Sequence, residues 1–377
     1  MTLKTTDKTA DEHHMRHALL LAGRGLGQVW PNPAVGCVIV KNNRIVGRGW
    51  TGQGGRPHAE TEALKQAGKK ARGSSVFVTL EPCHHTGKTP PCSMALIKAG
   101  VERVVVATKD PDPRVSGQGM DDLKDAGITV DYGLLQQQAT DLNQGFLSKV
   151  ILQRPLFALK TATTLDGRIA TKTGDSHWIT GPGARAFGHR LRSIHDAILI
   201  GRKTLEQDRP LLTCRLPGLE NRSPLRIVLD SRLSVDIHHP IMQTVDDHPL
   251  IIITGKPESC KKANRLKSLG VQVITAKTNA TGLIDVNDAA KKMAETGLTR
   301  VLIEGGGKVA ASFLSANLID RVYWFRAAKI IGGDGLPALA GMGVETMENV
   351  FSMERLETRP VGADILETFR IRSPDPI

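Results

Sequence analysis

The sequence has few aromatic side chains, which make up 4% of its 377 residues. Proteins that bind single-stranded nucleic acid stack bases on aromatic rings, so this composition does not favour a base-stacking platform. No apolar run approaches the roughly 18 residues that a membrane-spanning helix needs. Residues 1–10 are polar and lack the apolar segment of a signal peptide, and we expect them to form a flexible extension.

Cysteine is also scarce, and clusters of one charge sign are missing. Five cysteines, an odd number, argue against a disulfide framework and for a reducing compartment, so a cytoplasmic protein is expected. The formal net charge is +12, but lysines and arginines are scattered along the chain. This pattern favours phosphorylated small molecules as partners over nucleic acid or a membrane. The length is sufficient for two domains with separate cores.

Three soft metal ligands and one carboxylate gather between residues 57 and 92. The ligands are His58, Cys83 and Cys92, and Glu60 follows the histidine by two positions. A catalytic zinc keeps three protein ligands and leaves its fourth position to water, which then ionises at a pKa of about 7. Glu60 suits a proton shuttle better than a fourth ligand. The pattern predicts one zinc ion per chain, with Glu60 as general acid and base.

Other interpretations of this cluster remain open. A closed structural zinc site would need a fourth ligand, which His84 or His85 could supply, and such a site would indicate a non-enzymatic protein. The cysteines and the histidine could also be core residues that hold no metal.

The spacing of the two cysteines narrows the class of deaminase. Nucleic-acid deaminases place two residues between them, whereas eight intervene here. The run from Pro82 to Cys92 resembles the Pro-Cys-x-His-x-Gly-x-Thr-Pro-Pro-Cys motif of the deaminase of riboflavin biosynthesis. The resemblance implies that Asn32, in a Pro-Asn-Pro loop, holds a pyrimidine ring and that Lys88 grips the ribose phosphate. A plain turn and a solvated loop are the alternatives for these two residues.

Strands and helices alternate through the first 150 residues, which predicts a sheet covered by helices. This stretch resembles the cytidine-deaminase-like fold, a three-layer α/β/α domain. We expect the deaminase domain over residues 11–150. Arg154-Pro155 ends the last helix, and a strand begins at Leu156, so a second domain is expected over residues 155–377.

The second half carries a different set of signals. Leu165-Asp166-Gly167, a Ser-x-Trp-Ile-Thr run from Ser176 and a Gly-x-x-Thr-x-x-x-Asp-x-Pro-x-Leu run from Gly201 follow in order. Together they resemble the reductase domain of the same pathway, which implies a dihydrofolate-reductase-like α/β fold and NADPH. A buried strand then runs into Gly305-Gly306-Gly307, where backbone amides could bind a pyrophosphate. The spacing is not that of a Rossmann fingerprint.

The reductase resemblance assigns roles to particular residues. The positions implied to bind NADPH are Ala162, Trp178, Thr204, Asp208, Gly306, Gly307, Lys308, Val309, Ala310, Ala311 and Ser312. The positions implied to bind substrate are Ser176, Arg192, Leu212, Arg215 and Glu304. Arg192 and Arg215 suit a phosphate, because a guanidinium can donate two parallel hydrogen bonds. Lys160 and Asp208 are candidates for assisting proton movement in the reductase step.

Both halves point to one pathway, and the chain is similar to the bifunctional deaminase/reductase family of riboflavin biosynthesis over about residues 11–370. The resemblance implies zinc-dependent deamination of a ribosylated diaminopyrimidinone 5′-phosphate, then reduction of the ribosyl group to ribityl. An RNA deaminase would leave the second half unexplained, and a chain with one inactive half is a further alternative. The sequence leaves open NADPH against NADH, channelling and the oligomeric state, a homo-oligomer included.

Overall fold

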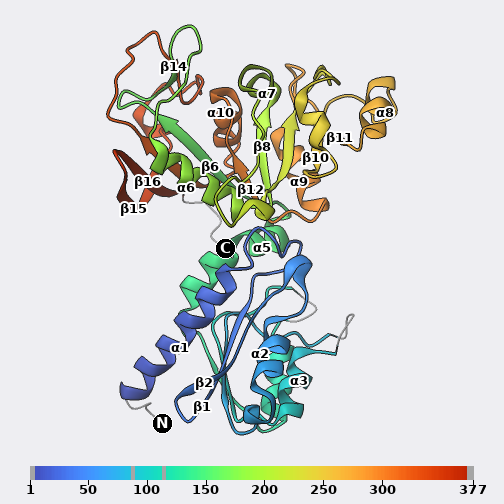
Figure 1. The fold of residues 1–377 in the computed structure, drawn as a ribbon, viewed down its shortest axis with the longest axis vertical. Helices are drawn as coiled ribbons and strands as arrows, with labels where there is room; N and C mark the ends of the chain where they lie inside the picture. The colour runs from blue at the N-terminus through green and yellow to red at the C-terminus, as the bar shows by residue number, and fades with distance from the viewer. Residues whose placement is uncertain (1–4, 86–89, 113–115, 372–377) are drawn as a thin grey trace. The chain divides into compact units, whose positions relative to one another are not determined.

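The computed structural model describes residues 5–85, 90–112 and 116–371. The chain divides into two compact units, Met1–Gln153 and Arg154–Ile377, which are described separately below (Figure 1). In the described part of the chain, the helices are too short or too polar to cross a membrane.

The first unit is built on a five-stranded sheet in the order β2-β1-β3-β4-β5. β1 is antiparallel to both of its neighbours, whereas β3, β4 and β5 are parallel. The strands are β1 (Gly36–Lys41), β2 (Arg44–Trp50), β3 (Ser75–Val78), β4 (Arg103–Val106) and β5 (Thr129–Tyr132).

Helices cover both faces of this sheet, as the alternation of strands and helices predicts. Cys37 and Ile39 of β1 face one core, and Val38 and Val40 face the other, because successive strand residues point to opposite faces. Helices α2 (Ala59–Ala67), α3 (Cys92–Ala99) and α4 (Gln118–Asp125) cover the first face, and α1 (Thr5–Gly23) and α5 (Gln136–Leu152) cover the second (Figure 1). Two short 3₁₀ turns, η1 (Gln53–Gly55) and η2 (Gly68–Ala71), flank α2.

Glycines let α2 lie directly against the edge strand β2. A Cβ at Gly49 would lie 2.0 Å from the carbonyl oxygen of Ala59, and one at Gly47 would lie 2.2 Å from that of Ala63. Any side chain at these positions would push the helix away. The close approach fixes the N-terminal end of α2, where His58 is the residue that precedes the helix.

Helix α1 begins at Thr5, within the stretch of residues 1–10 that was expected to form a flexible extension. Residues 5–10 are therefore helical, and the prediction of a flexible extension was wrong for them. Neither proline nor glycine interrupts the chain between Thr5 and Leu21, so nothing stops the helix from extending towards the N-terminus.

The second unit contains a nine-stranded sheet in the order β11-β10-β9-β8-β12-β6-β13-β16-β15. All pairings from β11 to β13 are parallel, and β16 and β15 add antiparallel strands at one edge. The strands are β6 (Leu156–Thr163), β8 (Ala197–Gly201), β9 (Leu225–Leu229), β10 (Leu250–Thr254), β11 (Gln272–Thr275), β12 (Arg300–Ile303), β13 (Ile319–Arg326), β15 (Met353–Val361) and β16 (Asp364–Ile371), and β7 (Arg168–Ala170) pairs separately with β14 (Leu336–Pro337).

Helices connect these strands and close two apolar cores. The helices are α6 (Pro182–Ser193), α7 (Arg202–Asp208), α8 (Lys261–Ser268), α9 (Val286–Glu295) and α10 (Gly307–Ser315), with 3₁₀ turns η3 (Glu220–Arg222), η4 (Pro240–Thr244) and η5 (Met347–Asn349). One core gathers side chains of β8, β9, β10 and β11 against α8, and another gathers those of β6, β12, β13 and β16 against α6. Because β6, β8 and β12 are parallel neighbours, the residues that follow β8 and β12 meet at one edge of the sheet.

Candidate active sites

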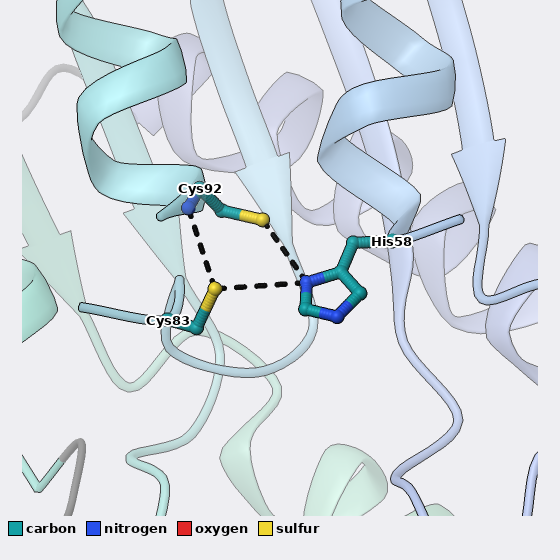
Figure 2. Close-up of side chains that lie close together, drawn as sticks. All are labelled: His58, Cys83 and Cys92. Carbon is teal, nitrogen blue, oxygen red and sulfur yellow. Dashed lines mark hydrogen bonds between the residues drawn. The ribbon is translucent and has the colours of Figure 1, made fainter. Parts of the chain in front are cut away.

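The structure brings His58, Cys83 and Cys92 together, as the sequence predicts. Nδ1 of His58 lies 3.2 Å from Sγ of Cys92 and 3.6 Å from Sγ of Cys83. Figure 2 shows this nitrogen directed between the two sulfur atoms. All the donor atoms lie within 4.8 Å of one another. His58 precedes α2 and Cys92 begins α3, so two helix N-termini converge on the cluster.

The donor set fits zinc. A tetrahedral zinc at about 2.0–2.3 Å from nitrogen and sulfur separates its ligands by about 3.6 Å, close to the two distances observed. Among the described residues, this is the one group of three or more such side chains that could hold an ion. Neither His84 nor His85 belongs to it, which disfavours the closed four-ligand alternative.

The pKa values of the two thiols shift in opposite directions. Hydrogen bonding with Cys92 and with His58 lowers the pKa of Cys83 to about 4, despite its burial. The contact with the Cys83 thiolate, together with burial, moves the pKa of Cys92 far upward. A divalent cation between the sulfurs would let both ionise, because metal ligation requires the thiolate form.

Glu60 lies in the first turn of α2 and is 4% exposed. Burial and the negative charge of Cys83 raise the pKa of Glu60 to about 7, although a hydrogen bond with Cys92 acts in the opposite direction. The carboxylate therefore lies beside the donor cluster and is shielded from bulk water. A carboxyl group in this position can both accept and return a proton near neutral pH.

A second buried carboxylate, Glu81, holds the loop that carries Cys83. Its Oε2 accepts hydrogen bonds from the amides of Asp110 and Gly117, and its Oε1 accepts one from that of Met120. Helix α4 also packs tightly against this loop: a Cβ at Gly119 would lie 1.9 Å from the carbonyl oxygen of Pro82, so a side chain has no room there. Glu81 was not predicted from the sequence, although its place directly before Pro82-Cys83 is a signal.

Asp122 of α4 joins the two cysteine segments. Its Oδ2 accepts a hydrogen bond from Oγ of Ser93 at 2.9 Å and lies 2.7 Å from Nδ1 of His84. Ser93 Oγ also lies 3.3 Å from the carbonyl oxygen of Cys83. The carboxylate of Asp122 therefore contacts one residue beside each cysteine. Nothing in the local sequence predicts this contact, because α4 is far along the chain.

Two further residues that the sequence singled out lie in loops of this unit. The side-chain amide of Asn32 donates to the carbonyl oxygen of Gly54 at 3.2 Å and packs against Gly55. Asn32 thus lies against the η1 turn that leads to His58. Lys88, the predicted phosphate contact, lies outside the described residues.

In the second unit, a cluster of opposite charges forms around Glu304, which directly follows β12. Nε and Nη2 of Arg192 donate to the two oxygens of Glu304 at 2.7 and 2.8 Å, and Nη1 donates to the carbonyl oxygen of Thr213. Nζ of Lys160 lies 3.7 Å from Glu304. Burial alone would raise the pKa of Glu304, but Arg192 and Lys160 outweigh it and lower that pKa to about 2.

The glycine run after β12 forms a tight cradle beside α7. Gly306 has a φ of 61°, and a Cβ there would lie 3.1 Å from Oγ1 of Thr204. A Cβ at Gly307 would lie 3.0 Å from the carbonyl oxygen of Pro337. Side chains here would block the amides at the start of α10, so the cradle fits the phosphates of a dinucleotide. Thr204 and Gly306, both predicted cofactor contacts, are thus brought together.

A surface loop carries the predicted cofactor residue Trp178. The indole is 62% exposed, and the guanidinium of Arg185 stacks 4.5 Å from its ring centre. Nζ of Lys329 donates to the carbonyl oxygen of Trp178 at 2.6 Å. Ser176 lies in the same loop and is partly exposed. The loop therefore exposes the flat indole ring of Trp178, and its backbone is held by a hydrogen bond from Lys329, which is far along the chain.

The remaining predicted residues have mixed surroundings. Asp208 ends α7, and its partial burial raises its pKa. The side chain of Leu212 is buried in the core of β8–β11, so only its backbone is available for a substrate. Arg215 is exposed, and its amide donates to Nδ1 of His189. Ala162 lies on β6, and residues 308–312 form the first turns of α10.

Two family models match this chain. The cytidine and deoxycytidylate deaminase zinc-binding region matches residues 8–108, and the RibD C-terminal domain matches residues 155–366. The matched regions contain the donor cluster and the Arg192–Glu304 cluster, respectively.

Whole-chain comparisons agree with the two family models. The riboflavin biosynthesis protein RibD of Aquifex aeolicus is 41% identical over 360 residues, which cover 96% of this chain and 98% of that protein. The Escherichia coli protein of the same name is 37% identical and covers 94% of this chain, with 98% of its own length matched. The structure of Acinetobacter baumannii RibD has a TM-score of 0.87 at 34% identity and covers 97% of this chain, with all of its own length matched.

The structure of a diaminohydroxyphosphoribosylaminopyrimidine deaminase/5-amino-6-(5-phosphoribosylamino)uracil reductase from Thermotoga maritima has a TM-score of 0.84 at 34% identity. It covers 97% of this chain and is itself covered completely. Fold and sites together define a bifunctional enzyme, with a zinc-dependent deaminase domain followed by an NADPH-dependent reductase domain. The chain belongs to the RibD family of riboflavin biosynthesis proteins.

Proposed function

We propose that this enzyme deaminates 2,5-diamino-6-ribosylamino-4(3H)-pyrimidinone 5′-phosphate and then reduces the ribosyl chain of 5-amino-6-(5-phosphoribosylamino)uracil to ribityl. The observation that carries the proposal is the three-ligand cluster with the buried Glu60 beside it, on one chain with the Lys160–Glu304–Arg192 cluster. The similar protein from Thermotoga maritima is named for the same two reactions. We assign them to residues 11–150 and 155–377.

In the first reaction, the protein holds the ring and moves a proton. His58, Cys83 and Cys92 would hold a zinc ion, which would make a water acidic enough to act as the nucleophile. Glu60 accepts a proton from that water and returns it to the amine, which leaves as ammonia while the ring carbon gains oxygen. Its burial keeps the proton from bulk water. Asn32 orients the pyrimidine ring, and Lys88 binds the phosphate.

In the second reaction, bound NADPH would supply the hydride for the first carbon of the opened ribose. The fork of Arg192 is engaged by Glu304, so we assign the substrate phosphate chiefly to Arg215. We place Lys160, whose Nζ lies 3.7 Å from Glu304, beside the reacting carbon, and Lys160 or Asp208 supplies the proton that completes the reduction. Ser176 and the backbone of Leu212 complete the substrate site.

We infer the position of the cofactor from the glycine cradle at the start of α10. We assign its phosphates to the amides of residues 306–309 and to Thr204, because these groups lie at the glycine turn that starts α10. Residues 310–312 follow in the same helix, where the amide of Ala310 already donates to the carbonyl oxygen of Gly306. Trp178 covers the cofactor with its exposed face, and Ala162 and Asp208 border it. A reducing cytoplasm suits a site that depends on two free thiols. A homo-oligomer is compatible with this arrangement, since each chain carries both sites.

A coupled assay on purified, zinc-loaded protein tests the proposal. We expect the diaminopyrimidinone ribosyl phosphate to release ammonia without NADPH, and NADPH to be oxidised only after that release. Ammonia release with no NADPH consumption would contradict the assignment of the second domain. If neither occurs, adenosine or cytidine in RNA becomes the deaminase substrate to test.

The Asp208→Ala variant tests whether the two sites work separately. We expect it to oxidise NADPH more slowly, while ammonia release stays at the wild-type rate, because Asp208 lies in the reductase unit. Loss of both activities together, in a variant that unfolds at the wild-type temperature, would contradict the two-site assignment.

A further inference from the structure

Leu165-Asp166-Gly167 forms the turn between β6 and β7, and none of its residues belongs to the proposed sites. Gly167 has a φ of 76°, and its amide donates to the carbonyl oxygen of Thr164 at 3.1 Å, which closes the turn. The strand β7 that follows pairs with β14, so this loop and segment 327–340 run side by side, near the β14 label in Figure 1. The contacts between the turn and this segment indicate what the turn does.

The carboxylate of Asp166 binds one part of segment 327–340. Its Oδ2 accepts a hydrogen bond from the amide of Gly332 at 2.7 Å, and its Oδ1 accepts one from the amide of Ile331 at 3.3 Å. Oδ1 also accepts a hydrogen bond from the hydroxyl of Thr164 at 2.6 Å. The hydrogen bond from Thr164 and those from the two amides lower the pKa of Asp166 to about 2. The group is therefore a charged acceptor at neutral pH.

The backbone of the turn contacts two other parts of the same segment. The amide of Leu165 donates to the carbonyl oxygen of Lys329 at 2.7 Å, and the carbonyl oxygen of Gly167 accepts a hydrogen bond from the amide of Ala338 at 3.1 Å. Each residue of the turn thus holds a different part of segment 327–340.

Two large apolar side chains at this contact contribute little to holding it. Leu165 is 57% exposed, and Ile330 is 74% exposed. Because most of the surface of both side chains stays in water, their burial stabilises the contact only weakly. A segment held mainly by hydrogen bonds near the surface opens more easily than one packed in a core. The acceptor groups of the turn therefore determine how often segment 327–340 is in place.

Segment 327–340 touches the proposed cofactor site at two points. Nζ of Lys329 donates to the carbonyl oxygen of Trp178 at 2.6 Å. Further along, the amide of Ala340 donates to the carbonyl oxygen of Gly307 at 3.0 Å, and the carbonyl oxygen of Pro337 packs against the same glycine. The segment thus connects the Trp178 loop with the glycine cradle.

We propose that Asp166 is a positioning residue for NADPH, which acts through segment 327–340 on the Trp178 loop and on the glycine cradle. The inference rests on the cofactor contacts proposed for Trp178 and Gly307. Without the carboxylate, fewer molecules have the segment in place, and the apparent affinity for NADPH falls in proportion to that fraction. Bound NADPH restores the arrangement, so the reaction at saturating cofactor is preserved.

Calorimetric titration of the zinc-loaded full chain with NADPH tests the proposal. Asp166→Ala should weaken NADPH binding by about tenfold or more, because two amides lose a charged acceptor. Asp166→Asn keeps the shape and one acceptor oxygen, so its affinity should lie between those of the wild type and the alanine variant. The asparagine variant also preserves the test if the alanine variant does not fold, which circular dichroism would show.

Steady-state NADPH oxidation with the already deaminated substrate separates positioning from chemistry. Both variants should raise the KM for NADPH by the same factors as in the titration, with kcat within about twofold of the wild type and the KM for the pyrimidine unchanged. Asp334→Ala removes an exposed carboxylate of the same segment and should match the wild type. Ammonia release should be normal in all three variants.

A double variant tests the route through Lys329. Lys329→Met removes the hydrogen bond to Trp178, so it should weaken NADPH binding in the wild type. In Asp166→Ala the same change should have a clearly smaller effect, because the segment is already loosened.

Wild-type NADPH affinity in both Asp166 variants would overturn the proposal. A lower kcat at saturating NADPH with an unchanged KM would also overturn it, because Asp166 would then act in the chemical step. If Trp178→Ala binds NADPH as tightly as the wild type, the proposed cofactor contact itself is wrong and the inference fails with it. The titration of Trp178→Ala therefore distinguishes the two failures.

Discussion

The two reaction centres of this enzyme differ in how the chain assembles them. The three candidate zinc ligands come from one stretch, residues 58–92, and two helix N-termini bring them within 4.8 Å. Arg192 and Glu304 are 112 positions apart, and they meet with Lys160 only because β6, β8 and β12 are parallel neighbours. The side chains of the first site come from two neighbouring helix starts in one stretch, and those of the second are joined across strands that are far apart in the sequence.

The difference also concerns charge. The first site concentrates negative charge, as the raised pKa of Glu60 beside the Cys83 thiolate shows, and it needs a cation to be complete. In the second site, the charge of Glu304 is paired with Lys160 and Arg192 of the protein itself. Because each unit contains its own cluster of ionisable side chains, we expect a single substitution to lower one activity and leave the other unchanged.

The largest effect is expected for Glu60→Gln. The amide cannot accept the proton from the attacking water, so ammonia release should fall by about 10²–10⁴-fold. Zinc content by metal analysis should remain at one per chain, and reduction of the already deaminated substrate should be normal. Glu62→Gln, on the same helix, serves as the matched control and should retain both activities. Normal ammonia release in Glu60→Gln would contradict the assigned role.

Glu304→Gln should have the next largest effect, on the second unit alone. It leaves Arg192 and Lys160 without a counter-charge, which should destabilise this unit by about 3–5 kcal/mol and abolish NADPH oxidation. Thermal unfolding followed by circular dichroism measures the first effect. Glu295→Gln removes only an exposed pair with Lys292 and should change stability by less than about 1 kcal/mol.

The carboxylate of Glu304 also makes the stability of the second unit depend on pH. Its pKa is lowered in the folded state, to about 2 from an ordinary 4.5, so its contribution is complete above about pH 4.5 and is lost as the pH falls towards 2. The hydrogen-exchange protection factors of peptides from β6 and β12, which are corrected for the slower intrinsic exchange in acid, should therefore fall over this interval in the wild type and change less in Glu304→Gln. An identical profile in the two proteins would show that Glu304 does not titrate with unfolding.

Glu81→Gln should weaken the first site without removing a ligand. Glutamine has one acceptor oxygen in place of two, so at least one of the amides of Asp110, Gly117 and Met120 loses its partner. Outer groups that orient metal ligands are typically worth about 10–100-fold, and we expect such a loss in zinc affinity or ammonia release. The exposed Glu102→Gln is the control. Wild-type zinc affinity and ammonia release in Glu81→Gln would exclude a positioning role.

Ser93→Ala should give the smallest effect. It removes one hydrogen bond to Asp122, worth about 1 kcal/mol, while the Cys83 and Cys92 ligands stay in place. Chelator titration should show slightly easier zinc loss, and the NADPH-dependent reaction should not change. An effect as large as that of Glu81→Gln would mean that the Asp122 contact, rather than Glu81, holds the two cysteine segments together.

Several features of the fold could be predicted because they depend on short-range patterns. Alternating apolar strands and amphipathic helices predict the layered first unit, and proline at Pro155 places the break between the units near residue 154. The start of α1 could not be placed, because polar residues 5–10 continue a helix as readily as they form a loop. Periodicity contains no signal that distinguishes the two.

The sequence by itself determined which side chains meet in the three-ligand cluster, since His58, Cys83 and Cys92 stand at characteristic spacing within one stretch. It also determined the order of the two domains. Only the tertiary structure decided that Glu81 and Asp122 hold the cysteine segments and that the fork of Arg192 is occupied by Glu304. The tertiary structure alone also placed the side chain of Leu212 in the core. These outcomes depend on contacts between distant elements, whose geometry follows from strand register and helix packing and not from neighbours in the chain.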